Sequence, residues 1–477
     1  MRKYKEEWLG NIKGDLLAGL VVCMALIPEV IGFTIVAGVD PMIGIYSSFC
    51  ISVIIAIFGG RTGMISAAAG SMALVLAGLV KSHGVQYMLA ATILTGIIQI
   101  IFGYLKVGKL IKYIPKPVML GFVNALGIMM FKSQLEHFKG SYILIILGIL
   151  SIAIIYYLPK IFKAIPSPIV SIVIVSVIAI FFKLDIKRLG DMGAINSQLP
   201  TFLIPNVPFN FETLKIILPY SVSLSLVGLI ESLLTAQIVD EETNTESDKN
   251  KESVGQGLAN VVAGFFGGIA GCGMIGQTVL NITYGGIGRL STFCAGTFML
   301  IFVIVLNKIV VQVPVVALAS VMLVVAFTTV NWQSIKRVKS VPKSDAIVMI
   351  LTVIIVVLTD NLAYGVVAGV ILSAVIFAFK SANIAVDKLS IKGEVRYLVK
   401  GPLFFASTDK FINSFNYDED VSKVEIDFLE SKIVDESAVE AIDKVINKFK
   451  KNNIKVNIIA MNDGSLGLFN TLSAHKE

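Results

Sequence analysis

The chain has 477 residues, of which 55% are apolar and only 15% are charged, and its mean hydropathy is +0.82. Soluble globular proteins contain about 45–50% apolar and about 25% charged residues, so this composition nearly rules out a soluble enzyme or a disordered chain. The net charge of +7 comes from the apolar part of the chain. Residues 1–385 contain 27 Lys and Arg and 18 Asp and Glu, whereas the residues after 385 contain 13 Lys and Arg and 15 Asp and Glu.

Long apolar segments follow one another from residue 15 to about residue 380, which predicts a polytopic α-helical membrane protein. We expect about fourteen segments, at residues 15–36, 42–58, 63–80, 86–104, 118–131, 142–158, 169–182, 214–239, 254–269, 273–284, 290–306, 314–330, 346–358 and 362–379. Several are short for a bilayer core about 30 Å thick, so their ends are approximate.

Clusters of Lys and Arg predict the orientation of these segments. They lie around residues 2–13, 106–116 and 336–343, and connections rich in Lys and Arg stay in the cytoplasm. We therefore expect a multi-pass protein of the cell membrane. Residues 1–14 form a cytoplasmic N-terminal segment and residues 15–385 the transmembrane domain, whose even number of spans returns the C-terminus to the cytoplasm.

The tail after residue 385 has a different pattern. Residues 395–405 and 421–428 alternate apolar and polar side chains, residues 435–451 have apolar side chains at helical spacing, and residues 455–461 form a further strand. This order predicts a small cytoplasmic α/β domain over residues 386–477.

No set of residues indicates an enzyme, a metal site or a nucleic-acid site. The cysteines lie in apolar or Gly-rich stretches without a CxxC pair, and we expect them to be buried apolar side chains: Cys23, Cys50, Cys272 and Cys294. There is no Ser/His/Asp set, no phosphate loop and no basic tract interleaved with aromatic residues. We predict no catalytic residue, no metal site and no cofactor apart from a coupling ion. The acidic stretch at residues 240–252 is expected to be a solvated loop, and the alternative is that it contacts the domain after residue 385.

Two halves of the apolar part contain similar elements. Glu29 precedes Gly63-Met64-Ile65, and Glu231 precedes Gly273-Met274-Ile275. Seven segments per half is an odd number, so the second half would be inverted, with repeats at about 15–185 and 212–385. Short Gly-interrupted segments at matching places in inverted halves indicate the binding site of a secondary transporter.

Two half-helices that begin near the membrane midplane would direct their free N–H groups at one point and attract an anion. We predict that this substrate site is formed by Ser66, Ala67, Ser71, Gly276, Gln277 and Thr278. The alternative is that the Gly and Ala residues only permit close packing of helices.

Glu29 and Glu231 are the carboxylates that we place well inside the segments. A carboxylate in the membrane costs at least about 2.5 kcal/mol, so it is a functional candidate by default. Pro28 removes a backbone donor beside Glu29, and Thr235 lies one helical turn from Glu231. We predict that Glu29, Glu231 and Thr235 bind the coupling ion, H⁺ or Na⁺, with a possible Na⁺ site at Glu231 and Thr235. The alternative is a protonated carboxyl group bonded between helices.

The chain resembles the SulP family, also called solute carrier family 26. The matching motifs occur in the family's order, at residues 15–19, 27–29, 37–41, 44–46, 231–235, 255–260 and 264–268. The resemblance implies 14 transmembrane segments as 7+7 inverted repeats, with core and gate domains that move against each other. It also implies an anion between the third and tenth half-helices, a C-terminal STAS domain and a homodimer.

The chain departs from the family pattern at three positions. Glu29 stands where the motif often has Gln, which fits a cation-coupled symporter, and Glu231 with Thr235 resembles the pattern of bicarbonate–sodium symporters. Gln277 stands where many relatives have Arg, so the site has no fixed cation. Glu436 occupies the position that is phosphorylated in STAS antagonists, so no phosphorylation switch is expected.

We therefore predict a secondary active transporter of a small anion (sulfate, bicarbonate or a dicarboxylate) that works by alternating access, coupled to H⁺ or Na⁺. One alternative is a nucleobase symporter of the same architecture. The other is a membrane-anchored signalling or scaffold protein that acts through a cytoplasmic partner of the STAS domain.

Overall fold

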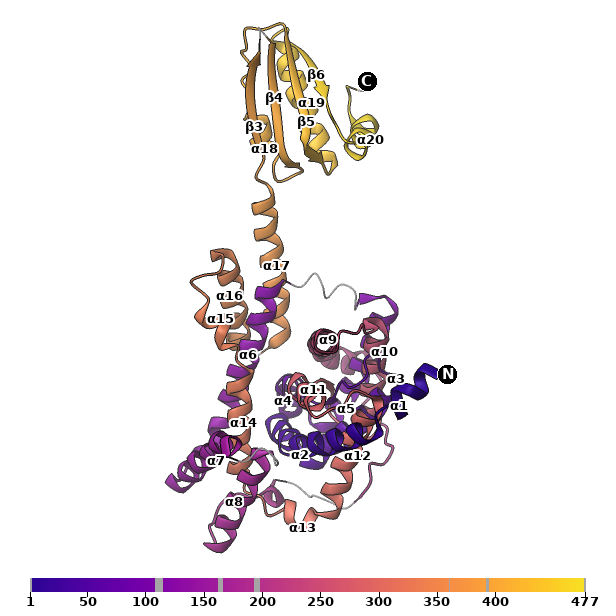
Figure 1. Cartoon of the computed structure of the whole chain (residues 1–477), viewed down its shortest axis with the longest axis vertical. Coiled ribbons are helices and arrows are strands. Elements are labelled where there is room, and N and C mark those ends of the chain that lie inside the picture. Colours follow the sequence, from indigo (N-terminus) through magenta and orange to yellow (C-terminus); the bar gives the residue numbers. More distant parts are fainter. Residues whose placement is uncertain are drawn as a thin grey trace. The chain divides into compact units, whose positions relative to one another are not determined.

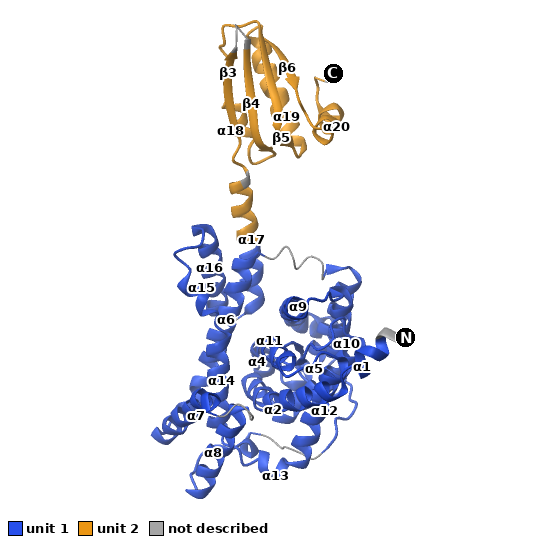
Figure 2. Cartoon of the chain, viewed as in Figure 1, with its two compact units in different colours: residues 1–370 blue, residues 371–477 orange. Residues whose placement is uncertain are grey.

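The computed structural model describes residues 2–107, 115–161, 166–192, 198–359, 361–391 and 394–475. The chain forms two compact units, residues 1–370 and residues 371–477 (Figure 2). The division falls inside one helix, Leu362–Ser381.

Unit 1 is helical (Figure 1). Its helices are α1 Arg2–Leu9, α2 Ile12–Ala37, α3 Pro41–Phe58, α4 Gly70–His83, α5 Val85–Tyr104, α6 Lys116–Gln134, α7 Tyr142–Ile161, α8 Ser167–Phe181, α9 Phe211–Thr243, α10 Lys249–Phe265, α11 Ile275–Thr283, α12 Arg289–Val305, α13 Asn307–Val310, α14 Val315–Thr329, α15 Trp332–Lys336, α16 Lys343–Thr359 and the start of α17 Leu362–Ser381. Among the described residues, seven helices are long and apolar enough to cross a membrane, and shorter apolar helices accompany them. The prediction of a helical membrane protein is therefore confirmed.

Two short strands interrupt the helices of unit 1. Strand β1, Ser66–Ala68, pairs antiparallel with β2, Gly271–Gly273, and Ala67 lies opposite Cys272. The half-helices predicted to begin at residues 63 and 273 start later, because α4 begins at Gly70 and α11 at Ile275. The residues before them are extended since they bond to one another across the two halves.

This register corrects the similarity seen in the sequence. A local twofold axis through the antiparallel pair relates Ala67 to Cys272, 205 positions apart, and a helix begins three residues after each. Gly63 and Gly273 are 210 positions apart, so the two Gly-Met-Ile sequences are not structurally equivalent. Helices α4 and α11 are equivalent in the two halves, but the alignment that relates them is not the one that superimposes the two Gly-Met-Ile sequences.

The helices of the two halves pack in a reciprocal way. Helix α5 packs on α9 and α10, and α12 packs on α2 and α3. Each half therefore supplies a helix to the first two helices of the other, as expected for an inverted repeat. A second group forms around α6, which packs on α14 and α16, while α14 also packs on α7.

The acidic stretch after α9 is solvated in part: Glu241, Glu242, Glu246 and Asp248 are exposed, whereas Asp240 and Glu252 are not. Asp240 accepts hydrogen bonds from Arg61 Nη1 at 3.1 Å and from Lys249 Nζ at 2.6 Å. The buried Glu252 carboxylate accepts from the main-chain N–H groups of Gly60 at 2.7 Å and Arg61 at 3.0 Å. These two carboxylates hold the segment that leads into β1, so that Glu252 is buried and Asp240 is half-buried.

The C-terminal unit contains a sheet of order β3-β4-β5-β6. Its elements are β3 Ala385–Ile391, β4 Glu394–Leu403, α18 Thr408–Ile412, β5 Lys423–Ile433, α19 Glu436–Lys451, β6 Lys455–Ile459 and α20 Asp463–Leu472. Strand β3 is antiparallel to β4, and the other pairs are parallel. The predicted strands and helix correspond to β4, β5, β6 and α19, whereas β3, α18 and α20 were not predicted.

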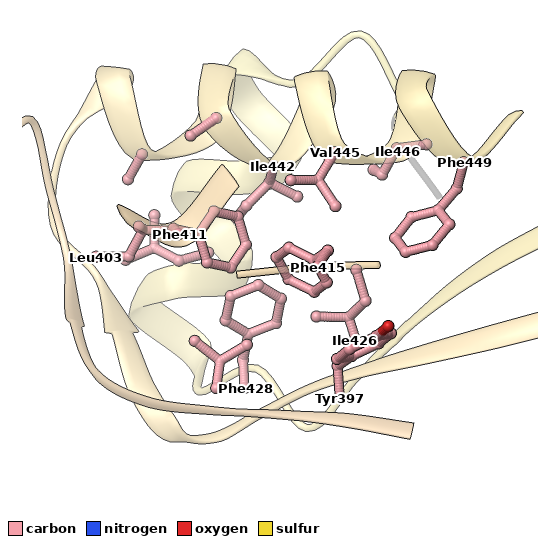
Figure 3. Close-up of a cluster of buried hydrophobic side chains, with 14 of the residues drawn as sticks. Tyr397, Leu403, Phe411, Phe415, Ile426, Phe428, Ile442, Val445, Ile446 and Phe449 are labelled. Atoms are coloured by element: carbon pink, nitrogen blue, oxygen red, sulfur yellow. The ribbon is translucent and has the colours of Figure 1, made fainter. Parts of the chain in front are cut away.

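Helix α19 covers the sheet with the apolar face that its sequence predicts. Ile442, Val445 and Phe449 are buried and point toward an aromatic cluster that includes Phe411 and Phe428 (Figure 3). Burial of one such side chain contributes about 1.5–3 kcal/mol, so this interface supplies much of the stability of the unit.

Asp435 is the N-cap residue of α19. Its carboxylate accepts hydrogen bonds from the N–H groups of Ala438 at 3.0 Å and Phe405 at 2.9 Å. Glu436 is the first helical residue and already supplies a negative charge at the positive end of the helix. Both residues therefore stabilise the helix start without phosphorylation.

A Gly271→Ala substitution should destabilise the protein. A Cβ atom at this position would lie 2.1 Å from the Ala67 carbonyl oxygen, so the strand pair would have to separate. We expect a loss of about 1–3 kcal/mol, measured as a lower Tm of the purified protein. Gly276→Ala is the matched control, because nothing lies within 4 Å of a Cβ there. Equal melting of both variants would contradict the role of the strand pair.

Candidate functional site

A cavity of about 570 Å³ lies beside the strand pair in unit 1. Its walls come from α2, α4, α6, α9, α11 and α14 together with the end of β2. Of the described residues that line it, Glu29 and Glu231 are acidic and none is Lys, Arg or His. The cavity therefore contains two carboxylates without a fixed cation.

The first turns of α4 and α11 face this cavity. Gly70 and Ser71 line it from α4, and Ile275 and Gly276 line it from α11. The N-cap residues, Ala69 and Met274, make no side-chain capping bond. The first N–H groups of a helix need a partner and carry a partial positive charge. Two helix ends without a side-chain cap can thus donate to one anion in the cavity.

Glu29 connects α2 to the opposite half of the protein. It is 9% exposed, and its carboxylate accepts a hydrogen bond from Gln277 Nε2 in the first turn of α11. The two residues come from different predicted repeats, and both line the cavity. The structure therefore joins a predicted coupling residue to a predicted substrate residue.

Glu231 makes the reciprocal connection from α9. Its carboxylate accepts from Ser71 Oγ, in the first turn of α4, at 2.6 Å. It also accepts from Cys272 Sγ in β2, at 2.6 Å. The sequence predicts only a buried apolar role for Cys272. The thiol is indeed buried, but its contact depends on the strand pairing, which no local pattern shows.

The other predicted site residues do not line the cavity. Ser66 and Ala67 both lie within the strand pair and are fully buried. Thr278 Oγ1 accepts from the Ile65 N–H at 2.9 Å, so it joins the two halves. Thr235 donates to the carbonyl oxygens of Glu231 at 2.7 Å and Gly273 at 3.3 Å. Its hydroxyl group thus bonds the main chain and not the Glu231 carboxylate.

Several lining residues were not predicted because they come from distant helices. Phe122, Leu126 and Met130 line the cavity from α6, and Thr328 and Thr329 line it from α14. Their hydroxyl and apolar groups carry no sequence feature that separates them from ordinary packing residues. They make one wall of the cavity largely apolar.

The sequence matches the family model described as "Sulfate permease family" over residues 12–143 and 140–352, which is more than half of the chain. The chain belongs to the sulfate permease family. Its members are transporters and not enzymes, so the predicted family and the class of protein are confirmed. The expected membrane location agrees with a transporter family and with the apolar helices of unit 1.

Two curated relatives illustrate this similarity. The protein named "Putative sulfate transporter YbaR" of Bacillus subtilis (strain 168) is 52% identical over 98% of this chain and 98% of its own length. The bicarbonate transporter BicA of Picosynechococcus sp. is 29% identical over 80% of this chain and 72% of its own length.

Solved structures support the fold. The transmembrane domain of a cyanobacterial bicarbonate transporter BicA matches with a TM-score of 0.68 and 28% identity, over 74% of this chain and 97% of that chain. The murine Solute Carrier 26 family member A9 anion transporter, in its inward-facing state, matches with a TM-score of 0.86 over 99% of this chain and 89% of that chain. At 17% identity this second likeness shows the fold alone, and it includes the C-terminal unit.

A pair of serine variants tests the placement of the site. Ser71→Ala removes a hydroxyl group that lines the cavity in the first turn of α4, where the anion is predicted to bind, and a hydrogen bond to a charged group contributes about 1.5–3 kcal/mol. We expect KM for the transported anion to rise about tenfold or more in proteoliposome uptake. Ser66→Ala should change KM by less than about twofold, because the Ser66 hydroxyl group has no hydrogen-bond partner among the described residues. Equal effects of both variants would argue against the cavity as the binding site.

Proposed function

We propose that this protein is a secondary active symporter of a small anion, with H⁺ or Na⁺ as the coupling ion. The observation that carries the proposal is a cavity with two helix N-termini that lack side-chain caps, two carboxylates and no cationic residue among its described lining residues. Helix ends supply the attraction for an anion, and the carboxylates supply sites for the coupling ion.

The proposed substrates are sulfate, bicarbonate and small dicarboxylates. Main-chain N–H groups at the starts of α4 and α11 would bind their oxygen atoms, and Ser71 and Gln277 lie in the same first turns. The names of the relatives, sulfate and bicarbonate transporters, support this class of substrate. They do not favour the nucleobase alternative.

The coupling follows from the charge of the cavity. With Glu29 and Glu231 both ionised, the described lining carries two negative charges and no positive one, and like charges repel an entering anion. A proton or Na⁺ on one of the carboxylates reduces this repulsion, and one on each removes the net charge of the described lining. Binding of cation and anion must then favour each other by the same factor, which is thermodynamic coupling.

We extend the proposal to the larger architecture. The proposed protein has 14 transmembrane segments in 7+7 inverted repeats. In alternating access, the group of helices around α6 and α14 moves against the helices that carry the carboxylates. The reciprocal packing of α5 and α12 supports the repeat. We also propose a homodimer with the N-terminus and the STAS domain in the cytoplasm, and a partner for that domain as a second role.

The first experiment is uptake into proteoliposomes of the purified protein. Labelled sulfate, bicarbonate and fumarate are offered under a pH gradient alone and then under a Na⁺ gradient alone. We expect one anion to accumulate under one gradient. Glu29→Gln and Glu231→Gln should abolish accumulation, because a neutral amide cannot take up a proton and binds a cation more weakly than a carboxylate.

Three outcomes would contradict the proposal. Unchanged concentrative uptake in both Gln variants would remove the carboxylates from coupling. Exchange of anions without accumulation under either gradient would show an exchanger, in which Glu29 and Glu231 are structural. Inhibition of uptake by uracil but by none of the anions would instead favour the nucleobase alternative.

A further inference from the structure

A second hollow in unit 1 has no part in the proposed transport site. It has a volume of about 260 Å³ and lies between the start of α6, the start of α16 and the segment around α15. Its lining includes Lys116 and Arg337, whereas the described lining of the transport cavity contains neither Lys nor Arg. Sites for drug-sized ligands occupy about 300–1,000 Å³, so this groove suits a small polar group.

The two cationic side chains are available to a ligand. Both are exposed, and no carboxylate of the described residues forms an ion pair with either of them. Asn124 of α6 holds the segment before Arg337 in place: its Oδ1 accepts from the Asn331 N–H at 2.7 Å, and its Nδ2 donates to Ser334 Oγ at 2.9 Å. The segment that leads to Arg337 is therefore held against α6.

The groove is cationic at one end and apolar at the other. Along α6, Lys116 stands at the first position and Leu120 lies one turn further, while α16 supplies Met349 beyond its first turn. Both are helices of the membrane part of the chain. This gradient matches a phospholipid, whose phosphate lies at the membrane surface and whose acyl chains enter the apolar region.

We propose that this groove binds the phosphate of an anionic phospholipid headgroup. Basic pockets between membrane helices recognise such headgroups, and each Lys or Arg near the surface adds to the attraction. Lys116 and Arg337 bind the phosphate oxygens, and Leu120 with Met349 contacts the acyl chains. Asp345 also lines the groove and opposes the anion, so its charge sets an upper limit on the affinity. Helix α6 connects this groove to the transport cavity, because the same helix carries Phe122 and Met130.

The test measures the Tm of the purified full-length protein in a neutral detergent. Short-chain phosphatidylglycerol, phosphatidylcholine of equal chain length and inorganic phosphate are titrated separately. Phosphatidylglycerol should raise Tm at concentrations where the other two do not. The Lys116→Gln/Arg337→Gln variant should need on the order of tenfold more of this lipid for the same shift. Lys308→Gln, which removes an exposed positive charge away from the groove, should respond as the unaltered protein does.

Asp345→Asn gives a prediction of opposite sign. Removing the negative charge from the groove should lower the phosphatidylglycerol concentration that is needed, whereas a loss of structure would not strengthen binding. An unchanged lipid response in the Lys116/Arg337 variant overturns the site. A response to inorganic phosphate equal to that for phosphatidylglycerol overturns the lipid as its source, and weaker lipid binding by Asp345→Asn overturns the charge argument.

Discussion

The pairing of β1 with β2 is the interaction on which the rest of unit 1 depends. Extended backbone in the membrane interior is stable only if its N–H and C=O groups are bonded, since each unpaired group costs several kcal/mol. Here the two interrupted segments satisfy each other, and α10 completes the bonding because Asn260 bonds the Gly271 N–H at 2.9 Å and its carbonyl oxygen at 3.1 Å. The pairing fixes where α4 and α11 begin, and it brings both helix starts to one cavity.

The pairing of β1 with β2 also explains why each carboxylate bonds to a residue of the opposite half. Glu29 on α2 meets Gln277 of α11, and Glu231 on α9 meets Ser71 of α4. A change of charge on either carboxylate therefore acts directly on a helix end that faces the cavity. In the proposed symport, coupling between the cation and the anion needs no long path through the protein, because Glu29 and Glu231 are hydrogen-bonded neighbours of residues in the first turns of α11 and α4.

The sequence predicted the membrane class, the family and the acidic residues of the cavity, because composition and unusual residues in apolar segments are local features. It also predicted Ser71, Gly276 and Gln277 at the cavity wall. It misjudged where the short helices begin, since the similar Gly-Met-Ile sequences are offset from the structural repeat. Contacts of Cys272, and of Arg61 with Asp240, join segments more than forty and more than one hundred and seventy residues apart. No periodicity encodes such pairs.

The described cavity wall contains no cationic residue, but the fold does bury one elsewhere. Arg289 is 3% exposed and is held by Glu7 at 2.7 Å and by the Ala56 carbonyl oxygen at 2.9 Å. An arginine in the cavity would form an ion pair with Glu29, as Arg289 does with Glu7, and the pair would have no net charge. Helix N-termini attract an anion with partial charges that belong to the main chain. In the proposed symport, the carboxylates therefore remain available for the coupling ion while the anion is bound.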